Sequence, residues 1–252
     1  MKLSIVIPTL NEARYLPAAV AAVRRRAALG PPYEVLVADC ASADGTAEVA
    51  ERLGARVVRE ALPPDSRAAA LNRGAAAARG DVLLFLDADT LVPLAYDRSI
   101  RGALHDPQVV GGAFEFALDG PEVGLRLVEV INRIRYRIWP RYYGDQGVFA
   151  RSAVFRRVGG YPERRLLEAS DLCRTLARHG RLALIHKPMR TSPRRFLEGG
   201  TYRVLALDVN IWWRDLLGLP TEPFGAAYQE NNRRRAENAG AAGGVPPPAQ
   251  AQ

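Results

Sequence analysis

One stretch of this chain reads Val82-Leu83-Leu84-Phe85-Leu86-Asp87-Ala88-Asp89-Thr90, an apolar run that stops at two carboxylates one residue apart. The pattern is typical of a buried strand that ends in a charged site. In open α/β sheets, ligands bind at the carboxyl ends of the strands. Oxygen donors in that position suit Mg²⁺ or Mn²⁺, which bind through one or two carboxylates and the phosphates of a substrate. The alternative is a turn that only closes the strand, because Asp is common in turns.

Strands and helices alternate on the N-terminal side of this stretch. The apolar periodicity predicts strands at 3–7, 34–38, 56–59 and 81–86, and helices at 15–28, from 42–46 to about 53, and at 66–78. Such alternation predicts a parallel sheet with right-handed crossovers. Polar residues follow the strands, and we expect them along one edge of the sheet, where a ligand binds. They are Asn11, Glu12, Asp39, Asp87 and Asp89.

The second half of the chain is less regular. The pattern predicts strands at 109–116, 148–150 and 182–185, and helices at 123–138, 151–157, 166–179 and 202–217. A loop is expected at 142–147 and a glycine-rich turn at 159–162. Residues 236–252 are rich in Ala, Gly, Pro and Gln, which predicts a disordered tail.

The charge of the chain is strongly basic. Its 252 residues carry a formal net charge of +8, and nearly all of the basic side chains are arginines. Between Asn132 and Leu166, nine arginines accompany only Asp145 and Glu163. Such a block suits a phosphate-bearing substrate or an anionic membrane surface, and the alternative is a solvated face. No nucleic-acid-binding motif accompanies the charge, which argues against DNA or RNA as a partner.

Several classes of protein do not fit the sequence. The first predicted strand leads into Pro8-Thr9-Leu10-Asn11-Glu12, whereas a dinucleotide-binding fold has Gly-x-Gly-x-x-Gly and a nucleotidyltransferase has a glycine-rich basic loop. We find neither a signal peptide nor an apolar run of about 18 residues, so no membrane-spanning helix is expected. Cys40 and Cys173 form no disulfide framework and have no metal-ligand spacing, which favours a reducing cytoplasm.

Four motifs follow one another in the first half of the chain. They are Ile5-Val6-Ile7-Pro8-Thr9-Leu10-Asn11-Glu12, Val37-Ala38-Asp39-Cys40-Ala41-Ser42-Ala43-Asp44-Gly45-Thr46, Asn72-Arg73-Gly74 with Gly80-Asp81, and Asp87-Ala88-Asp89. In that order they resemble the nucleotide-binding half of family 2 glycosyltransferases of the GT-A fold. Later motifs resemble more narrowly the branch associated with arsenosugar biosynthesis. These are Gly144-Asp145-Gln146, Phe149-Ala150-Arg151, Gly159-Gly160-Tyr161-Pro162 and Thr191-Ser192-Pro193-Arg194-Arg195.

The resemblance, which covers roughly residues 3 to 218, implies an architecture and a reaction. The fold would be α/β, of the Rossmann-like GT-A type, with a mostly parallel sheet flanked by helices and a helical C-terminal part on the acceptor side. A single domain would span 1–235, with 1–105 for the nucleotide sugar and 106–235 for the acceptor. The implied reaction is inverting transfer of a sugar from a nucleotide-sugar donor to a hydroxyl group, with Mg²⁺ or Mn²⁺ as cofactor. The acceptor, a small molecule or a lipid-linked one, stays open, as does the oligomeric state.

Residues of the donor pocket are implied by position. Pro8, Asn11 or Glu12, and Asp39 match the pocket for the base and the ribose. Asp39 matches the acid that accepts a hydrogen bond from a uracil ring, which favours a UDP-sugar.

Three further positions are implied near the diphosphate and the sugar. Arg67 lies where a basic residue reaches the base or the diphosphate. Asp87 matches the acid near the ribose and the sugar, and Asp89 matches the direct metal ligand. A metal ion held there neutralises the charge that develops on the leaving nucleoside diphosphate.

The general base is the point where the chain departs from the family. Inversion needs a base that takes the proton of the acceptor hydroxyl. The family carries Glu-Asp-x-Asp/Glu-Leu after the glycine-rich turn, whereas this chain carries Glu168-Ala169-Ser170-Asp171-Leu172. Either Asp171, which we favour slightly, or Glu168 is the base, or the chain is a catalytically weak sugar-nucleotide-binding protein. Acids at a helix start also complement the helix dipole without any catalytic role.

Four other polar residues are candidate donor contacts. Asp145 and Gln146 lie in a polar loop, where they contact the donor sugar or the acceptor, or else stabilise a turn. Arg194 and Arg195 follow a predicted strand, where they bind the diphosphate through paired hydrogen bonds, or else form a solvated pair.

The last predicted helix carries an aromatic pair next to a cation. Trp212, Trp213 and Arg214 on an amphipathic helix suit a membrane interface, and the alternative is packing against the sheet. A lipid-linked acceptor would favour peripheral contact with a membrane.

Overall fold

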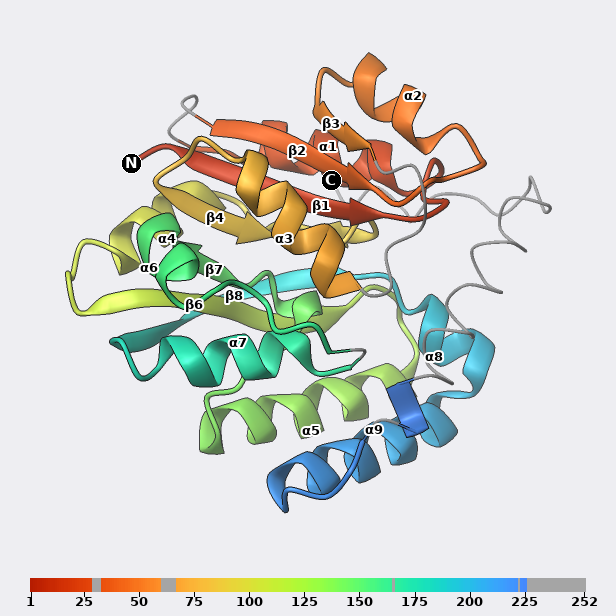
Figure 1. The fold of residues 1–252 in the computed structure, drawn as a ribbon. Helices are drawn as coiled ribbons and strands as arrows, with labels where there is room; N and C mark the ends of the chain where they lie inside the picture. Colours follow the sequence, from red (N-terminus) through yellow and green to blue (C-terminus); the bar gives the residue numbers. More distant parts are fainter. Residues whose placement is uncertain (29–32, 60–66, 165, 222, 226–252) are drawn as a thin grey trace.

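The computed structural model describes residues 1–28, 33–59, 67–164, 166–221 and 223–225. Within these residues, one sheet of eight strands forms the centre of the molecule, in the order β3-β2-β1-β4-β7-β6-β8-β5 (Figure 1). The strands are β1 (Leu3–Thr9), β2 (Tyr33–Asp39), β3 (Arg56–Arg59), β4 (Val82–Phe85), β5 (Thr90–Leu91), β6 (Val109–Leu118), β7 (Phe149–Arg151) and β8 (Arg181–Thr191). The helices are α1 (Leu16–Arg25), α2 (Thr46–Arg52), α3 (Arg67–Ala77), α4 (Tyr96–Ala103), α5 (Val123–Ile138), α6 (Ser152–Arg157), α7 (Glu168–Leu176), α8 (Arg194–Gly199) and α9 (Thr201–Leu216), with a 3-10 turn, η1 (Gly144–Gln146).

The first half of the sheet is parallel, as the strand–helix alternation predicts. β1 pairs in parallel with β2 and β4, and β2 pairs in parallel with β3. All four residues of β4 are buried, because helices cover both faces of a parallel sheet. The carboxyl ends of β1, β2 and β4 therefore meet at one edge of the sheet, and the polar residues that follow these strands lie there.

The second half of the sheet mixes strand directions and curls. β7 runs antiparallel to both β4 and β6, β8 runs parallel to β6, and β5 runs antiparallel to β8. β5 begins only a few residues after β4, yet it lies at the far end of the strand order. The segment 86–89 thus joins the end of β4 to the end of β8. Asp87 and Asp89 lie on this crossing segment.

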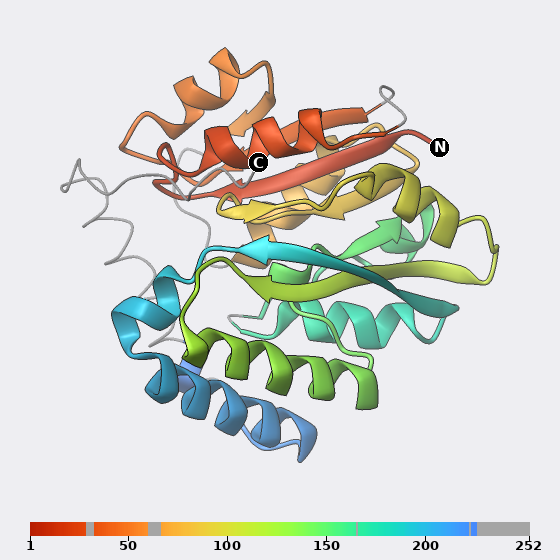
Figure 2. The ribbon, with the colours of Figure 1, turned by 180° about the vertical axis from the view of Figure 1, so that it is seen from behind.

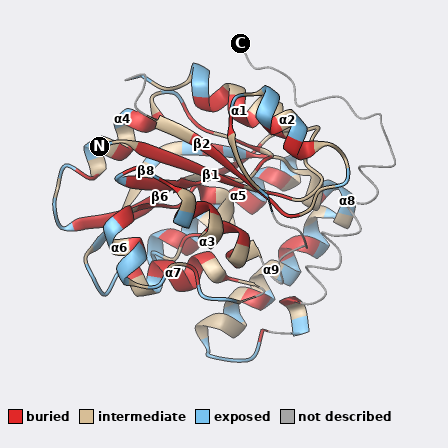
Figure 3. Ribbon diagram, turned by 45° about the horizontal axis from the view of Figure 1, so that its top comes forward, coloured by how far each residue is buried: buried red, intermediate tan, exposed pale blue. Residues whose placement is uncertain are grey.

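Two apolar cores hold the helices against the two faces of the sheet. One core combines the buried residues of α1, α2 and α4 with β1, β2 and β4. The other contains buried residues of α3, α5, α6, α7 and α9. The two opposite views show the helices on the two sides of the sheet, with α5 and α9 side by side at one edge of the molecule (Figures 1 and 2). Burial is concentrated in the strands, whereas the helices keep exposed outer sides (Figure 3).

Several elements depart from the sequence prediction. The apolar pattern ends at Ile185, and so does the predicted strand, whereas β8 continues to Thr191. Ile185 pairs with Phe114 and Pro188 pairs with Glu115, so the residues between them form a bulge that lets the strand resume. The sequence analysis predicted no counterpart of β5, α4 or α8. The tail predicted at 236–252 lies outside the described residues.

The side chain of Asn72 explains one of the recognised motifs. From α3 it donates a hydrogen bond of 2.8 Å to the carbonyl oxygen of Tyr161 and accepts one of 2.8 Å from the amide of Tyr161. A Cβ atom on Gly160 would lie 2.5 Å from the Asn72 side-chain oxygen, so only glycine leaves room for this clamp. The clamp fixes the turn that leads towards α7.

We expect Asn72→Ala to lower the free energy of unfolding by about 1–3 kcal/mol, because it leaves two backbone groups of Tyr161 without their partner. Denaturant-induced unfolding measures the change. Asn210→Ala, at an exposed position of α9, is the matched control and should change little. Equal stabilities of the two variants would contradict the role of the clamp.

Candidate active site

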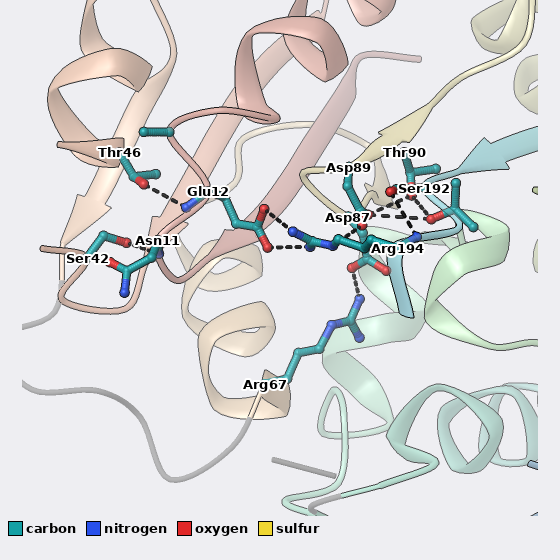
Figure 4. Close-up of polar contacts among 12 residues, drawn as sticks. Asn11, Glu12, Ser42, Thr46, Arg67, Asp87, Asp89, Thr90, Ser192 and Arg194 are labelled. Atoms are coloured by element: carbon teal, nitrogen blue, oxygen red, sulfur yellow. Dashed lines mark hydrogen bonds and ion pairs between the residues drawn. The ribbon is translucent and has the colours of Figure 1, made fainter. Parts of the chain in front are cut away.

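The loops that follow β1 and β2 are tied to each other by hydrogen bonds. The amide of Asn11 donates to the Ser42 hydroxyl at 2.9 Å, and the Asn11 side-chain oxygen accepts from the amide of Ala43 at 2.8 Å. The amide of Glu12 donates to the Thr46 hydroxyl at 2.9 Å. Asn11 has a positive φ of 54°, which asparagine tolerates better than most residues. These contacts fix Glu12 so that its carboxylate faces the centre of the edge (Figure 4).

Asp39 is buried at the end of β2 and is held from two sides. Its carboxylate accepts hydrogen bonds from the hydroxyl groups of Thr9 at 3.0 Å and Ser42 at 2.6 Å, and from the Ser42 amide at 3.1 Å. Pro8 lies beside it on β1, paired with Ala38. The carboxylate is therefore fixed in place next to Pro8 and Asn11, the other residues expected in the base pocket.

Arg194 links the end of β1 to the segment after β4. Its guanidinium group pairs with both oxygens of Glu12, at 2.6 and 3.1 Å, and its Nε lies 3.0 Å from Asp89 (Figure 4). The same group lies over the ring of Tyr15, 4.5 Å from its centre. The second oxygen of Asp89 lies 3.5 Å from the hydroxyl groups of Thr90 and Thr191.

Arg67 forms a second set of ion pairs at the same edge, next to the set formed by Arg194. From the start of α3, it donates to Asp87 and, at 2.7 Å, to Glu168 at the start of α7. Gly144 makes room for it, because a Cβ atom there would lie 2.7 Å from the Arg67 guanidinium group. Leu167, just before Glu168, has a φ of 66°, a left-handed conformation that is uncommon for leucine. The chain accepts this strain where it turns Glu168 towards Arg67.

The edge holds more negative than positive charge. Four carboxylates, those of Glu12, Asp87, Asp89 and Glu168, surround two guanidinium groups, which leaves two negative charges in excess when all are ionised. Burial raises the pKa of Glu12 to about 7, although Arg194 opposes the rise. Burial also raises the pKa of Asp89, and the neighbouring Asp87 adds to the effect.

These donors fit a divalent cation. Carboxylate and hydroxyl oxygens are hard ligands of the kind that Mg²⁺ and Mn²⁺ prefer, and a bound cation would favour the ionised form of all four acids. Within the described ranges, no group of three or more His, Cys, Asp or Glu side chains is arranged as a complete metal site.

Asp145 lies on η1 within a second charged group next to Asp87. Burial raises its pKa to about 7, the Asp87 charge adds to the rise, and Arg135 and Arg195 oppose it. Arg195 in turn donates to Asp208 on α9. Arg195 thus lies with Asp208, while Arg194 lies with Glu12 and Asp89, so these neighbouring arginines contact different acids.

The buried Gln146 side chain holds the η1 turn in place. It donates to the carbonyl oxygen of Phe114 at 3.1 Å, and its oxygen accepts from the Tyr143 amide at 3.1 Å and from Arg135 at 3.3 Å. With these partners it positions the loop that carries Asp145.

Asp171 lies in a different network from the other candidate acids. Its two carboxylate oxygens pair with Arg164 at 2.7 Å and Arg174 at 2.6 Å. Arg164 also pairs with Asp215, near the end of α9. Ala169, where the family has its second acid, is buried in the core beneath α7. The structure therefore brings Glu168 to the edge and leaves Asp171 joining α7 to α9.

The sequence analysis did not predict two of the contacts at the edge. Tyr15 stacks under Arg194, and Gly144 makes room for Arg67. The glycine of the Gly144-Asp145-Gln146 motif was a usable signal for a close approach, whereas Tyr15 read only as the beginning of a helix.

A curled α/β sheet with its acids at the carboxyl ends of β1, β2 and β4 is the architecture of the GT-A fold. The chain belongs to glycosyl transferase family 2, whose sequence profile matches residues 4–156. An uncharacterized glycosyltransferase of Nostoc sp. is 28% identical over 148 residues, which is 52% of this chain and 45% of the relative. One of Mycobacterium bovis is 40% identical over 86 residues, 34% of this chain and 36% of the relative. The matches thus span less than half the length of these curated relatives.

Solved structures confirm the fold. A mannosyltransferase from Pyrobaculum calidifontis, in complex with GDP-Man and Mn²⁺, superimposes with a TM-score of 0.63 at 20% identity, covering 97% of this chain and 76% of that one. Glucosyl-3-phosphoglycerate synthase from Mycobacterium tuberculosis, in complex with Mn²⁺, UDP and glucosyl-3-phosphoglycerate, gives a TM-score of 0.59 at 22% identity, covering 87% of this chain and 81% of that one.

The Asp145 carboxyl group should make stability fall with rising pH. The folded protein keeps this proton up to a pH of about 7, whereas the unfolded chain releases it near 3.8, so the folded state binds more protons in between. The free energy of unfolding therefore decreases as the pH rises through that window. In EDTA and without donor, Asp145→Asn should raise stability at pH 8 by about 1–2 kcal/mol, since a pKa unit corresponds to 1.36 kcal/mol and partial exposure screens the full shift.

Urea unfolding of both proteins at a series of pH values between 4 and 8 measures this difference. The raised pKa of Glu12 also makes the free energy of unfolding fall with rising pH, in the wild type and in the variant alike. The variant should therefore still lose stability with rising pH, but less steeply than the wild type. Parallel curves would show that Asp145 is not the group responsible.

Proposed function

We propose that this protein is an inverting, metal-dependent glycosyltransferase that moves a sugar from a nucleotide-sugar donor to a hydroxyl group of an acceptor. The observation that carries the proposal is the excess of partly buried carboxylates at the sheet edge, held around Arg67 and Arg194. Such a site attracts a cation and, with it, the diphosphate of a donor. The family, and the fold shared with structures solved with GDP-Man, UDP and Mn²⁺, support the same reaction.

Asp89 is the residue we expect to hold Mg²⁺ or Mn²⁺. Its burial, its raised pKa and its oxygen neighbours support this role. The bound metal ion would neutralise the charge on the leaving nucleoside diphosphate. Arg194 and Arg67 lie beside the acids at the same edge, and their guanidinium groups suit the diphosphate oxygens.

The donor pocket favours a UDP-sugar. The Asp39 carboxylate is fixed at the end of β2 by Thr9 and Ser42, which suits recognition of a ring N–H group such as that of uracil. Asn11 and Glu12, which are tied to the loop after β2, are expected to contact the same nucleoside, and Asp87 is expected near the ribose and the sugar. The motifs Gly144-Asp145-Gln146 and Thr191-Ser192-Pro193-Arg194-Arg195 support placement in the arsenosugar-type branch of the family.

Glu168 fits the general base better than Asp171. In the displacement, the acceptor oxygen attacks the anomeric carbon, the bond to the diphosphate oxygen breaks, and a carboxylate takes the hydroxyl proton. Glu168 shares Arg67 with Asp87, so it borders the donor site. Both oxygens of Asp171 are already paired with arginines.

The catalytically weak binding protein is the second candidate, favoured by Ala169. Position 169 faces the core, however, so an acid in that place would point away from Arg67 in this structure. The acid that faces the donor site is present as Glu168, which supports an active enzyme.

Glu168→Gln should lower kcat by about 10²–10⁴-fold, the usual contribution of a general base, while leaving donor binding intact. Asp171→Asn should keep most of the rate per folded molecule but lose about 1–3 kcal/mol of stability, because it removes the negative charge that pairs with Arg174 and, together with Asp215, with Arg164. Transfer rates with a donor panel and denaturant unfolding separate the two effects. The reverse pattern would make Asp171 the base, and donor binding without turnover in the wild type would support the binding protein.

UDP-sugars with Mn²⁺ should raise the Tm by about 5–10 °C at a hundred times the Kd, because ligand binding then adds about 2.7 kcal/mol. GDP-sugars should have less effect. Asp89→Asn should abolish the part of the shift that depends on Mn²⁺, whereas Asp106→Asn, on the surface away from the edge, should keep it. Thermal-shift measurements with each donor, with Mn²⁺ or EDTA, provide the comparison.

A further inference from the structure

The exposed apolar side chains of this protein are concentrated on one part of its surface. Within the described residues, every exposed large apolar side chain except Met1 and Leu94 lies on α5, α8, α9 or the turn after α9. A distribution this uneven marks an interaction surface, since scattered single residues are the norm on soluble proteins.

Helix α5 has an outer side made only of apolar residues and arginines. Val123, Leu127, Val130, Ile134 and Ile138 are between 44% and 83% exposed and follow one another at helical spacing. The other exposed residues of the helix are Arg126, Arg133 and Arg137. The helix has a single acid, the buried Glu129, which pairs with Arg126.

Helix α9 extends this surface. Gly124, near the start of α5, packs against Thr201 at the start of α9, and Trp139, just after α5, stacks edge-to-face on Trp212 with ring centres 5.5 Å apart. The two helices therefore run parallel along their length, and both views show them side by side (Figures 1 and 2). Tyr202, Leu207 and Trp213 of α9 are exposed, and so is Leu217 just after it.

The carboxylates of α9 are already neutralised. Asp208 pairs with Arg195, and Asp215 pairs with Arg141 and Arg164. Among the exposed residues of the two helices there are arginines but no acid. Exposed acids stand just before the helices, at Glu122 and on α8 at Glu198, so the basic and aromatic character is strongest towards the C-terminal ends.

We propose that the C-terminal halves of α5 and α9 form a docking surface for an anionic lipid bilayer. Its lining residues are Val130, Arg133, Ile134, Ile138, Trp213 and Leu217. The apolar side chains enter the boundary between headgroups and acyl chains, Arg133 contacts lipid phosphates, and Trp213 lies at headgroup depth. Each helix exposes one apolar side and packs the opposite side against the protein, so the helices would lie in the plane of the bilayer. No helix in the described part of the chain is long and apolar enough to cross a membrane.

Charge favours a lipid surface over the other occupants. In a symmetric contact between two copies, the arginines of this surface would face a partner surface that has no exposed acid. The chain's own segment 226–252 contains Arg233, Arg234 and Arg235, and its large apolar residues are few. An anionic bilayer supplies both the apolar layer and the negative charge.

Vesicle flotation with the full chain, without donor or metal, tests the inference. The wild type should float with vesicles of phosphatidylcholine and phosphatidylglycerol and much less with phosphatidylcholine alone. Val130→Glu combined with Ile134→Glu should weaken binding at least ten-fold, and Arg133→Gln about five-fold on the anionic vesicles only. Leu94→Glu is the matched control, since Leu94 is 72% exposed outside this surface and should float like the wild type.

Three results would overturn the inference. They are a wild type that stays at the bottom with anionic vesicles, equal binding to neutral vesicles, and equal flotation of the double variant. Sedimentation equilibrium without vesicles identifies the rival occupant: a dimer that the double variant dissociates would make this surface a subunit contact. Circular dichroism confirms that each variant is folded. Vesicle binding needs no donor, so its outcome is independent of the transfer reaction proposed above.

Discussion

The structure of this protein depends on keeping an excess of carboxylates together at one edge of a sheet. Like charges in a partly buried place repel each other, and burial itself disfavours ionisation. Two guanidinium groups, those of Arg67 and Arg194, offset this repulsion, and each of them pairs with two acids. Two guanidinium groups do not balance four ionised acids, and the remaining negative charge suits the divalent cation proposed above.

The fold brings Arg67 and Arg194 to the acids at this edge from distant parts of the chain. Arg67 comes from the start of α3, and Arg194 comes from the residues just after β8, which must reach the end of β1. The curl of the sheet makes this contact, because the segment after β4 crosses to β5 and pairs with β8. The Ser192 amide bonds to the carbonyl oxygen of Asp89 at 3.1 Å, which fastens the two segments beside Arg194.

Local chemistry allowed part of this to be predicted. The apolar run at Val82–Phe85 and the acids after it predicted the strand and its charged end, and the strand–helix alternation predicted the parallel half of the sheet. The order of the motifs indicated the family. Nothing local indicates that Arg67 meets Glu168 or that Arg194 meets Glu12, because these contacts depend on how the sheet curls. β8 was also predicted too short, because a bulge that only the pairing with β6 reveals carries it past Lys187.

The ion pair between Glu12 and Arg194 joins residues 182 positions apart, and the one between Arg67 and Glu168 joins residues 101 positions apart. Closing such long loops costs conformational entropy, so these contacts form only together with the tertiary structure around them. The edge is thus assembled only when β8 and the segments around it have docked onto the parallel half. Glu12, Asp87 and Asp89 follow strands of the N-terminal half, whereas Glu168 and Arg194 come from the second half of the chain. A complete set of ion pairs at this edge therefore requires that both halves of the sheet are in their native arrangement.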